Sequence, residues 1–532
     1  MPQSIAPKAL HGLILKALAN DGTELAIVDV REEQAFAENH LLYAISVPLS
    51  RLEMLMADLA PRRDAQVVVC DAGDGAMAAR AAAKLEEYGY TAVHTLDGGV
   101  AGWAKAGNET YGGFNVPSKA FGEHVEHHFG TPSVSAEQLN GMIQSGEKMV
   151  ILDSRPMDEY NTMNIPGATC CPGGELVYRV HEIAPDPDMT VVVNCAGRTR
   201  SIIGAQSLIN AGIPNKVVAL QNGTMGWHLS GFQLEHGNTA LHPDPSAPSV
   251  DVAKQRADGV DNRFQVSHAT LDQVHAWQQD KSRSLFLVDV RTADEFAAGH
   301  LPGSKHAPGG QLVQATDRYA GVRGARIVAI CDTGVRSTMA AHWLKQMNWD
   351  VHVLEGGLPS SGLAIGASAK PVLGDPSAAA TIDSASLKAS LDKGEVAVID
   401  LGYSRDYRKG HVPGAHFLIR SRLDTDKANL PKAAAYVVTS EDGLAAAVAA
   451  SELSAALSAP VTALAGGTDA WREADLPMET GETHMASEPT DVWLKPYERK
   501  GTVEDFMNEY LTWEIALVDQ IKKDDTVKFW AP

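Results

Sequence analysis

The chain has few cysteines, only five among 532 residues. So small a number excludes the disulfide framework of a small secreted domain. It favours a reducing, cytoplasmic setting for the protein. The cysteines that are present therefore need an explanation other than covalent cross-linking.

Long hydrophobic runs are also missing. No stretch reaches the roughly 18 continuous apolar residues that a membrane-spanning helix needs, so we expect no membrane insertion. The apolar patch near the start is interrupted by Lys16, and no small-residue cleavage site follows it. We expect an ordinary first helix there and no secretory signal.

Positive charge is in deficit. The 45 lysines and arginines stand against 66 acidic residues, which gives a formal net charge of −21. A general basic surface is thereby excluded, so neither nucleic acid nor an anionic membrane is expected as a partner. A local basic pocket for a small anion remains compatible with this balance.

What the sequence does have is an internal repeat, found four times. Each copy has an apolar run that ends in Asp, a turn, a second apolar run, a helix pattern, and a third run that ends in a Gly-containing turn. The four opening runs are 25-LAIVD-29, 149-MVILD-153, 285-LFLVD-289 and 396-VAVID-400. Short apolar strands alternating with helical patterns are typical of small parallel sheets with helices on both faces. The sequence thus predicts an α/β fold of four such units.

Polar, Pro-rich segments separate the units and set the expected domain boundaries. Residues 112–118, 241–251 and 365–377 are interpreted as linkers. The expected domains are residues 1–112, 128–238, 262–364 and 378–482, followed by a helical extension over 483–532. Residues 502–523 predict an amphipathic helix with Thr502 and Asp505 as a capping box. We expect this helix to pack across the repeats, with binding of a protein partner as the alternative.

Two short motifs recur inside the units. Arginine follows the opening Asp by two positions at Arg31, Arg155 and Arg291, and an acidic–aromatic pair such as Glu159-Tyr160 comes next. Buried charges near strand ends usually need partners. We therefore interpret both motifs as structural ties between a strand end and the next helix.

Three of the five cysteines fall at one position of the repeat. Cys70, Cys195 and Cys331 come after the second apolar run, where the fourth copy has Ser440. In open parallel sheets, ligands bind at the carboxyl edge of the strands. The pattern predicts a reactive site there.

Two of these cysteines stand in similar loops, 195-CAGRTRS-201 and 331-CDTGVRS-337. In both, Arg follows the cysteine by five positions and Ser by six. A short Gly-containing loop at a helix start can turn several N–H groups toward the sulfur, and the helix N-terminus and the arginine add positive potential. These effects favour the thiolate, and the same loop can hold an anionic substrate.

These loops resemble the active loop of the rhodanese sulfurtransferases, Cys-x-x-Gly-x-Arg-Ser/Thr. The loop 331-CDTGVRS-337 matches throughout, whereas the loop at Cys195 has its Gly one place early. The Asp-x-Arg motif, turns such as 411-HVPGA-415, and Gly-Gly turns followed by Trp103 or Trp471 are also similar to rhodanese motifs. The resemblance extends from about residue 5 to 482 and implies four tandem rhodanese-like domains.

The resemblance implies a two-step sulfur transfer that needs no metal and no organic cofactor. The thiolate of Cys195 or Cys331 attacks a small anionic sulfur donor such as thiosulfate, sulfite leaves, and the enzyme holds a persulfide. A thiol or cyanide then takes the outer sulfur. Arg200 and Arg336 are expected to bind the donor oxygens.

The remaining loop residues are expected to contribute to substrate binding. Ser201 and Ser337 are expected to cap the following helices and to touch the substrate. The full expected set of substrate-binding residues is Gly197, Arg198, Thr199, Arg200, Ser201, Thr333, Gly334, Val335, Arg336 and Ser337.

Two of the four units depart from this pattern. The loop 70-CDAGDGA-76 has Gly75 and Ala76 in place of Arg and Ser, and its two carboxylates disfavour both a thiolate and an anionic donor. Cys70 is therefore a candidate nucleophile that receives sulfur from another cysteine, or a relic. The loop at Ser440 has neither Cys nor Arg, so we expect a structural or partner-binding role there.

Two functions other than sulfur transfer remain open. Cysteine-dependent phosphatases and arsenate reductases use a related loop, but theirs is generally Cys-x₅-Arg, one residue longer than the loops here. A non-enzymatic scaffold of rhodanese-like repeats is the second alternative. The intact loops at Cys195 and Cys331 argue against it, and Ser440 argues for it in the last unit.

The remaining cysteines and a histidine cluster are interpreted as structural. Cys170 and Cys171 align with His306 and Ala307 in the next unit, which favours ordinary thiols over a regulatory pair. The cluster of His124, His127 and His128 contains an i, i+4 pair that could bind zinc, but no fourth ligand stands nearby in the sequence. We expect a solvated or interdomain face there and no metal.

Overall fold

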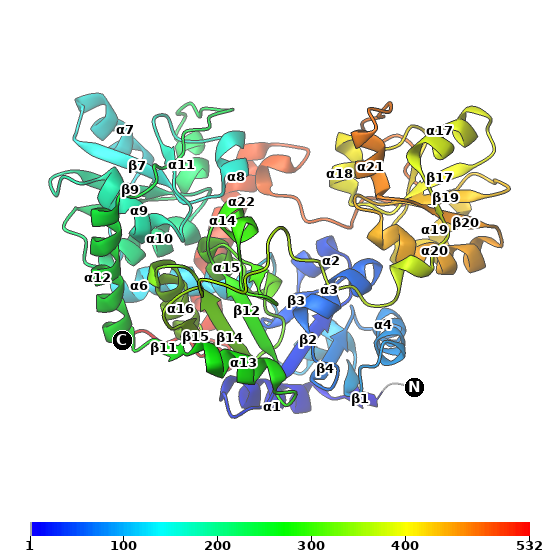
Figure 1. Cartoon of the computed structure of the whole chain (residues 1–532), viewed down its shortest axis with the longest axis horizontal. Helices are drawn as coiled ribbons and strands as arrows, with labels where there is room; N and C mark the ends of the chain where they lie inside the picture. The colour runs from blue at the N-terminus through cyan, green and yellow to red at the C-terminus, as the bar shows by residue number, and fades with distance from the viewer. Residues whose placement is uncertain (1–2) are drawn as a thin grey trace. The chain divides into compact units, whose positions relative to one another are not determined.

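The computed structural model describes residues 3–532. Contacts divide the chain into two compact units, one with residues 3–8, 26–113 and 370–494, the other with residues 9–25, 114–369 and 495–532. The first unit contains the sheets of repeats 1 and 4, and the second contains those of repeats 2 and 3 together with the C-terminal helix (Figure 1). None of the helices within residues 3–532 is long and apolar enough to cross a membrane.

Each repeat forms one five-stranded parallel sheet, and the strand order is the same in all four. From one edge to the other, the strands follow the order first, fifth, fourth, second and third along the chain. The strands are β1 (Gln3–Ile5), β2 (Leu25–Asp29), β3 (Ala44–Ser46), β4 (Gln66–Cys70) and β5 (Val93–Leu96) in repeat 1; β6 (Ser133–Val134), β7 (Met149–Asp153), β8 (Thr169–Cys170), β9 (Thr190–Asn194) and β10 (Val217–Leu220) in repeat 2; β11 (Ser267–Ala269), β12 (Leu285–Asp289), β13 (Lys305–His306), β14 (Arg326–Ile330) and β15 (Asp350–Leu354) in repeat 3; and β16 (Thr381–Ile382), β17 (Ala397–Asp400), β18 (His416–Phe417), β19 (Tyr436–Thr439) and β20 (Val461–Leu464) in repeat 4. The predicted α/β class and the four parallel sheets are confirmed.

Helices alternate with these strands. They are α1 (Pro7–Leu18), α2 (Glu33–Glu38), α3 (Leu52–Leu59), α4 (Ala76–Glu87) and α5 (Gly99–Lys105) in repeat 1; α7 (Ala136–Ser145), α8 (Met157–Thr162), α9 (Leu176–Ile183), α10 (Thr199–Asn210) and α11 (Gly223–Leu229) in repeat 2; α13 (Leu271–Gln279), α14 (Ala293–Ala298), α15 (Gly309–Gln314) and α16 (Val335–Gln346) in repeat 3; and α17 (Ser384–Asp392), α18 (Ser404–Lys409), α19 (Leu423–Asp426), α20 (Leu444–Leu457) and α21 (Gly467–Glu473) in repeat 4. The central strands, such as the run 191–193, are completely buried, as a sheet covered on both faces requires.

Three further helices lie outside the repeated pattern. These are α6 (Val116–Phe129) before repeat 2, α12 (Ala247–Phe264) before repeat 3, and α22 (Val503–Ile521) near the C-terminus. The first two start inside segments interpreted as linkers, so these segments also hold the first residues of a helix, which was not predicted; most of α6 is buried. Helix α22 begins after Thr502, as predicted, but the Thr502 side chain makes no capping hydrogen bond.

The Asp-x-Arg motif is a structural tie, as expected. In repeat 2, the Arg155 guanidinium donates from Nε and Nη2 to the two carboxylate oxygens of Asp153, at 2.9 and 2.7 Å, and both side chains are fully buried. The same pairing joins Asp29 to Arg31 and Asp289 to Arg291. A buried pair of this geometry satisfies charges that the end of a central strand would otherwise leave without partners.

Backbone pairing identifies the loop position in repeats 2, 3 and 4. The strand residues Asn194, Ile330 and Thr439 pair with the Asp that ends the opening strand of their repeat. The next residue along the chain is Cys195, Cys331 or Ser440. These three residues therefore occupy equivalent places at the carboxyl edge of their sheets.

Repeat 1 differs by one residue from the alignment that the sequence suggests. The Val30 N–H donates to the Cys70 carbonyl at 3.1 Å, just as the Ser154 N–H donates to the Asn194 carbonyl at 2.8 Å. Cys70 is thus the last residue of β4, and Asp71 stands at the loop position. The expectation that Cys70 is equivalent to Cys195 and Cys331 is wrong, because the strand continues one residue past the apolar run.

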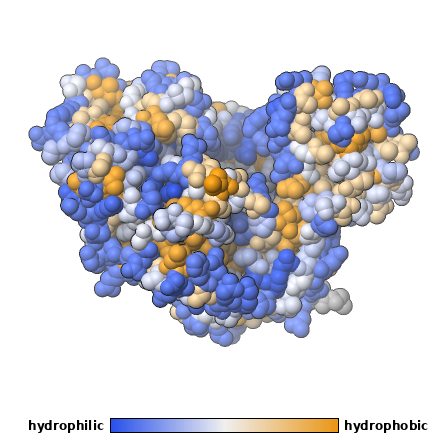
Figure 2. All heavy atoms as spheres, in the orientation of Figure 1, coloured by the Kyte–Doolittle hydropathy of each residue, from blue (hydrophilic) through white to orange (hydrophobic). Residues whose placement is uncertain are grey.

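On the face drawn in Figure 2, hydrophilic residues predominate and the hydrophobic patches are small and scattered. Among residues 3–532, the large hydrophobic side chains classed as exposed are Leu241, Ile365 and Ile515. Single exposed apolar residues of this kind are normal on a protein surface.

Candidate active site

The two loop cysteines lie in closely similar surroundings. Each is the first residue after a central strand, β9 for Cys195 and β14 for Cys331, and each is about 2% exposed or less. The Cys195 thiol lies 3.6 Å from the Ser201 hydroxyl, and Cys331 Sγ lies 3.2 Å from the Ser337 hydroxyl. In both repeats a serine six positions along the chain therefore reaches back to the sulfur.

The serines do not cap the helices, contrary to expectation. Helices α10 and α16 begin four residues after the cysteine, so Ser201 and Ser337 already lie in the first turn. Their hydroxyls donate to the carbonyls of Arg198 and Gly334, at 2.8 and 3.1 Å. The sulfur thus lies beside the start of a helix, where the backbone carries partial positive charge.

The arginines of the two loops are held by carboxylates. Arg200 donates two hydrogen bonds to Glu159, at 3.1 and 2.8 Å. Arg336, which is completely buried, donates to Glu295 at 2.7 and 2.8 Å, to Glu175 at 3.0 Å and to Asp332 at 2.8 Å. The donor-binding role expected for Arg200 and Arg336 stays a prediction, since a donor would have to compete with these carboxylates.

Glu159 and Glu295 were missed as site residues. They are the acidic members of the acidic–aromatic pairs, and each stands six residues after its strand-ending Asp. Repeat 1 has Ala35 at that place and Ala76 in place of the loop arginine. The joint presence of this Glu and the loop Arg is a sequence signal that could have identified the pair.

The other loop residues of repeat 2 are covered by α6 and α22. Arg198 donates to Glu123 at 2.7 and 2.8 Å and also contacts Glu126. The Thr199 hydroxyl donates to Glu514 of α22 at 2.5 Å. A Cβ on Gly197 would come within 3.0 Å of Met225 and 3.2 Å of Glu514, so the C-terminal helix closes tightly over this loop.

The Cys331 loop, in contrast, borders an open cavity of about 620 Å³. Among the predicted binding residues, Thr333 and Gly334 line it, together with Asp332 and the turn Gly356-Gly357. Val335 is completely buried and starts α16. The two intact loops therefore differ in what lies above them.

In repeat 1 the loop binds a carboxylate of its own. The N–H groups of Gly73 and Gly75 donate to one oxygen of Asp71, at 3.0 and 3.2 Å, and the Ala78 N–H donates to the other oxygen at 3.0 Å. Asp71 stands where repeats 2 and 3 have Cys195 and Cys331. This arrangement demonstrates that the loop backbone can form an anion receptor at that position.

Cys70 itself is a core residue. It is completely buried, and burial together with the neighbouring carboxylates of Asp29 and Asp71 raises the pKa of its thiol well above the ordinary value. In repeat 4 the Ser440 hydroxyl oxygen accepts a hydrogen bond from the Ala446 N–H at 3.2 Å. The backbone of that loop also points toward the side chain at the loop position.

The other cysteines and the histidine cluster have structural surroundings. Burial raises the pKa of Cys170 to about 12 and that of Cys171 well above its ordinary value. His124 lies among Phe121, His128 and Phe529, and burial lowers its pKa. Within residues 3–532, no cluster of three His, Cys, Asp or Glu side chains is suited to hold a metal ion.

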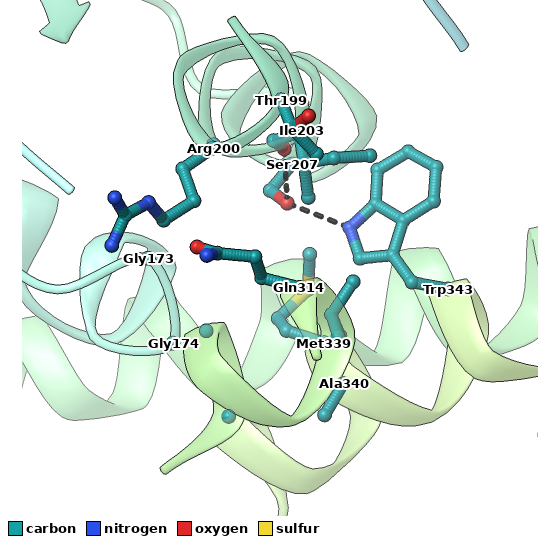
Figure 3. Close-up of a pocket in the computed structure, with 14 residues that line it drawn as sticks. Gly173, Gly174, Thr199, Arg200, Ile203, Ser207, Gln314, Met339, Ala340 and Trp343 are labelled. Atoms are coloured by element: carbon teal, nitrogen blue, oxygen red, sulfur yellow. Dashed lines mark hydrogen bonds between the residues drawn. The ribbon is translucent and has the colours of Figure 1, made fainter. Parts of the chain in front are cut away.

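A small cavity lies between α10 and α16, the helices that follow Cys195 and Cys331. Figure 3 shows Arg200 at one side of it and Trp343 at the other, with the turn Gly173-Gly174 nearby. The Trp343 indole donates to the Ser207 hydroxyl at 2.9 Å across the junction of repeats 2 and 3. With a volume of about 30 Å³, this cavity has room for little more than a water molecule.

Comparisons with known proteins agree with this geometry. The model of the rhodanese-like domain family matches residues 14–106, 135–230, 270–360 and 383–474. The crystal structure of a thiosulfate sulfurtransferase from Pseudomonas aeruginosa is 46% identical, with a TM-score of 0.95, and the similarity covers 99% of each chain. SseB of Mycobacterium tuberculosis, a proposed thiosulfate sulfurtransferase, is 25% identical over 276 residues, which are 42% of this chain and 91% of SseB. Since the family model matches four segments and this relative is similar over nearly the whole chain, the chain belongs to the rhodanese-like domain family and is a sulfurtransferase with four such domains in tandem.

Proposed function

We propose that this protein is a thiosulfate sulfurtransferase that carries sulfane sulfur as a persulfide on Cys195 and on Cys331. The observation that carries the proposal is the position of these two cysteines. They stand where the loop of repeat 1 binds the Asp71 carboxylate through three backbone N–H groups. A thiolate or a persulfide at this position is an anion of the same charge. The name of the relative from Pseudomonas aeruginosa supports thiosulfate as the donor.

The transfer proceeds in two displacements. The cysteine thiolate attacks the outer sulfur of thiosulfate, the S–S bond of the donor breaks, and sulfite leaves with the bonding electron pair. The enzyme then holds Cys–S–S⁻. Cyanide or a thiolate attacks the outer sulfur, takes it as thiocyanate or as a new persulfide, and regenerates the cysteine thiolate. The two displacements together involve no net oxidation or reduction, so no redox partner is required.

Within this mechanism the loop arginines act through their charge. Glu159 holds Arg200, and Glu295 holds Arg336, at the first turn of the helix that follows each cysteine. Their charge still favours an anion at the sulfur, although it is reduced by the paired carboxylate. We propose Cys195 and Cys331 as the nucleophiles and leave Cys70 out of the catalytic set.

A docking role is the second candidate, and it applies to repeat 4. Ser440 stands at the loop position, and no cysteine or arginine accompanies it. Such a repeat can bind a protein partner but has no nucleophile for sulfur.

We propose the cytoplasm as the place of action, on the ground that a chain with few cysteines and two reactive thiols suits a reducing compartment.

The test is intact mass after brief incubation with thiosulfate, for the wild type and for Cys195→Ser, Cys331→Ser and Cys70→Ser. We expect two additions of about 32 Da in the wild type and in Cys70→Ser, one in each of the other two variants, and removal of all of them by cyanide. The absence of any adduct from the folded wild-type protein would overturn the proposal. An adduct lost with Cys70→Ser would show that the catalytic set is wrong.

A further inference from the structure

The arginines of the two loops are paired with carboxylates, so the cation that binds an anionic donor is not evident from the loops alone. Thiosulfate carries two negative charges, whereas Arg198, Arg200 and Arg336 each hold at least one carboxylate. Binding an anion near a sulfur that is itself negative needs a cation that is close by and less fully neutralised. The loops do not supply one from within their own sequence.

The helices α6 and α12 carry the same pattern of residues. Aligned at their last residues, Phe129 and Phe264, the sequences 116-VPSKAFGEHVEHHF-129 and 251-DVAKQRADGVDNRF-264 have identical residues at two further places and similar residues at three. The matched residues are Lys119 and Lys254, Gly122 and Ala257, Glu123 and Asp258, Val125 and Val260, and Glu126 and Asp261. Both helices lie outside the segments that match the rhodanese-like domain model.

Each of these helices packs on the helix that follows a reactive cysteine. Helix α6 contacts α10, and α12 contacts α16. The approach is close at Gly122, where a Cβ would come within 2.7 Å of Thr199 Cγ2. A small residue at this position therefore lets the helix lie against the loop, with the lysine one turn nearer the helix start.

The distribution of this helix follows the distribution of the nucleophile. Repeats 2 and 3 have the helix and the cysteine. Before β16 of repeat 4, which has Ser440 in place of cysteine, the described chain has a short 3₁₀ turn at Pro376–Ala378. Repeat 1 stands at the start of the described residues and provides no comparison. In the three repeats that can be compared, helix and cysteine occur together.

At Cys195 the lysine is enclosed. Lys119 has 8% of its side chain exposed, contacts the Tyr510 hydroxyl, and lies 3.9 Å from Glu514. Burial lowers the pKa of Lys119, while the negative charges of Glu514 and of a Cys195 thiolate act to raise it. The attraction between the lysine and the thiolate is mutual, so Lys119 acts electrostatically on the reactive sulfur.

At Cys331 the equivalent lysine is accessible. Lys254 has 47% of its side chain exposed and lines the cavity of about 620 Å³ beside loop residues Thr333 and Gly334. Four carboxylates line the same cavity, but Asp332 is paired with Arg336 and Asp261 with His268. Asp258 and Glu355 then remain as the cavity carboxylates that oppose Lys254, and Asp251, one turn earlier on α12, lies 4.0 Å from the Lys254 Nζ. This exposed pair is longer than the hydrogen-bonded pairs that hold the loop arginines, so Lys254 keeps more of its charge for an anion.

We propose that the helix before each cysteine-bearing repeat supplies the cation that receives the anionic sulfur donor, Lys119 at Cys195 and Lys254 at Cys331. The inference rests on the proposed function for the identity of the donor. It adds to the site two residues that lie outside the repeats. The lysine ammonium meets the sulfonate oxygens of thiosulfate, which leaves the outer sulfur free for the thiolate, and it neutralises charge as sulfite departs.

The test uses single-site proteins, beginning with Lys254 because an exposed side chain can be replaced without loss of folding. In Cys195→Ser protein, where Cys331 is the remaining loop cysteine, Lys254→Met should raise the thiosulfate concentration for half-maximal persulfide formation by about tenfold or more. Lys254→Arg keeps the positive charge and should bring this concentration most of the way back to that of the parent protein. The matched control is Lys281→Met, because Lys281 lies just before β12, at the amino edge of the same sheet and opposite the edge that bears Cys331.

A pair of alkylating reagents separates donor binding from a merely structural effect. Iodoacetate and iodoacetamide differ in charge but hardly in size, and both transfer their carbon to the thiolate with loss of iodide. Loss of a cation that binds anions should lower the rate with iodoacetate relative to iodoacetamide, whereas general damage to the loop should lower both rates alike. An unchanged ratio, or an unchanged thiosulfate dependence, in Lys254→Met would overturn the proposal.

The same measurements apply to Lys119 in Cys331→Ser protein. Since Lys119→Met alone leaves Glu514 buried without the positive charge of the lysine, the double variant Lys119→Met, Glu514→Gln removes both charges together. If no protein forms a persulfide with thiosulfate, the proposed function fails, but the ratio of the two alkylation rates still decides whether the lysines attract anions to the cysteines.

Discussion

The loops of repeats 1 and 2 occupy the same place in the fold and present opposite chemistry there. In repeat 1 the loop position holds Asp71, whose carboxylate accepts three backbone hydrogen bonds. In repeat 2 it holds Cys195, with Ser201 beside its sulfur. The comparison shows that the loop backbone after the central strand can form an anion receptor in repeat 1. We infer that the same strand–loop–helix geometry in repeat 2 surrounds the proposed nucleophile, so that the residue at the loop position decides the chemistry there.

The equivalence of Asp71 and Cys195 can be tested by placing an aspartate at the loop position of repeat 2. In Cys331→Ser protein, Cys195→Asp should abolish persulfide formation completely, because the remaining nucleophile is gone. The fold should persist, since repeat 1 accommodates a carboxylate at this position. The measurements are intact mass after thiosulfate and the thermal unfolding midpoint.

The matched control for that variant is Cys195→Ser in the same background, which removes the thiol without adding a charge. Both proteins should be inactive. A Cys195→Asp protein that still gains sulfur would refute the equivalence of Asp71 and Cys195, and one that fails to fold where Cys195→Ser does fold would show that the loop of repeat 2 cannot receive a carboxylate.

Most of the fold could be predicted from sequence because its signals are local and repeated. Runs such as 149–153 and 285–289 have the length and the two-sided apolar character of buried parallel strands, and they recur in one order. The linkers were less predictable. Helices α6 and α12 begin within Pro-containing polar segments, and their burial depends on contacts with α10 and α16 that leave no local pattern.

The candidate site was predicted in part. The positions of Cys195 and Cys331 follow from local motifs, whereas the residue that faces the loop in repeat 1 depends on strand register, which shifted the assignment from Cys70 to Asp71. Contacts between segments that are far apart in the sequence could not be predicted. Glu514 meets Thr199 from 315 residues away, and nothing in either segment alone indicates this.

Within repeat 1, removal of the carboxylate should measure the stability that it contributes. Asp71→Ala leaves three N–H groups without their acceptor, one of them buried at Ala78. Since hydrogen bonds to charged groups contribute more than neutral ones, we expect a loss of about 2 to 4 kcal/mol from the free energy of unfolding. Chemical denaturation followed by circular dichroism provides the measurement.

The matched control is Asp74→Ala in the same loop. Asp74 accepts a single exposed hydrogen bond, from the Ala76 N–H at 3.1 Å, so its loss should cost well under the amount seen for Asp71. Equal effects of the two substitutions would mean that Asp71 is not the acceptor on which the loop depends.

A second comparison contrasts the strand-ending aspartates. Asp153 in repeat 2 is paired with Arg155, but in repeat 4 the residue two positions after Asp400 is Gly402. Asp400 is 3% exposed and accepts a hydrogen bond from the Gly402 N–H at 2.7 Å. Burial raises the pKa of Asp400 to about 7, because the Gly402 N–H and the charge of Arg51 lower it by less than burial and the neighbouring Glu441 carboxylate raise it.

The pKa of Asp400 makes a prediction about pH with a definite sign. The folded state holds the Asp400 proton more tightly than the unfolded state, where the pKa has its ordinary value of 3.8. The stability that this proton confers is therefore fully present below pH 4 and is lost as the pH rises to about 7. Asp400→Asn keeps the acceptor for the Gly402 N–H but cannot ionise, so it should be the more stable protein at pH 8, by on the order of 1 to 2 kcal/mol, and should lose this advantage at pH 4. Unfolding midpoints measured from pH 4 to pH 8 give the comparison, with the exposed Asp424→Asn as the control that should show no such trend. A constant difference between Asp400→Asn and the wild type across that range would mean that Asp400 does not titrate there.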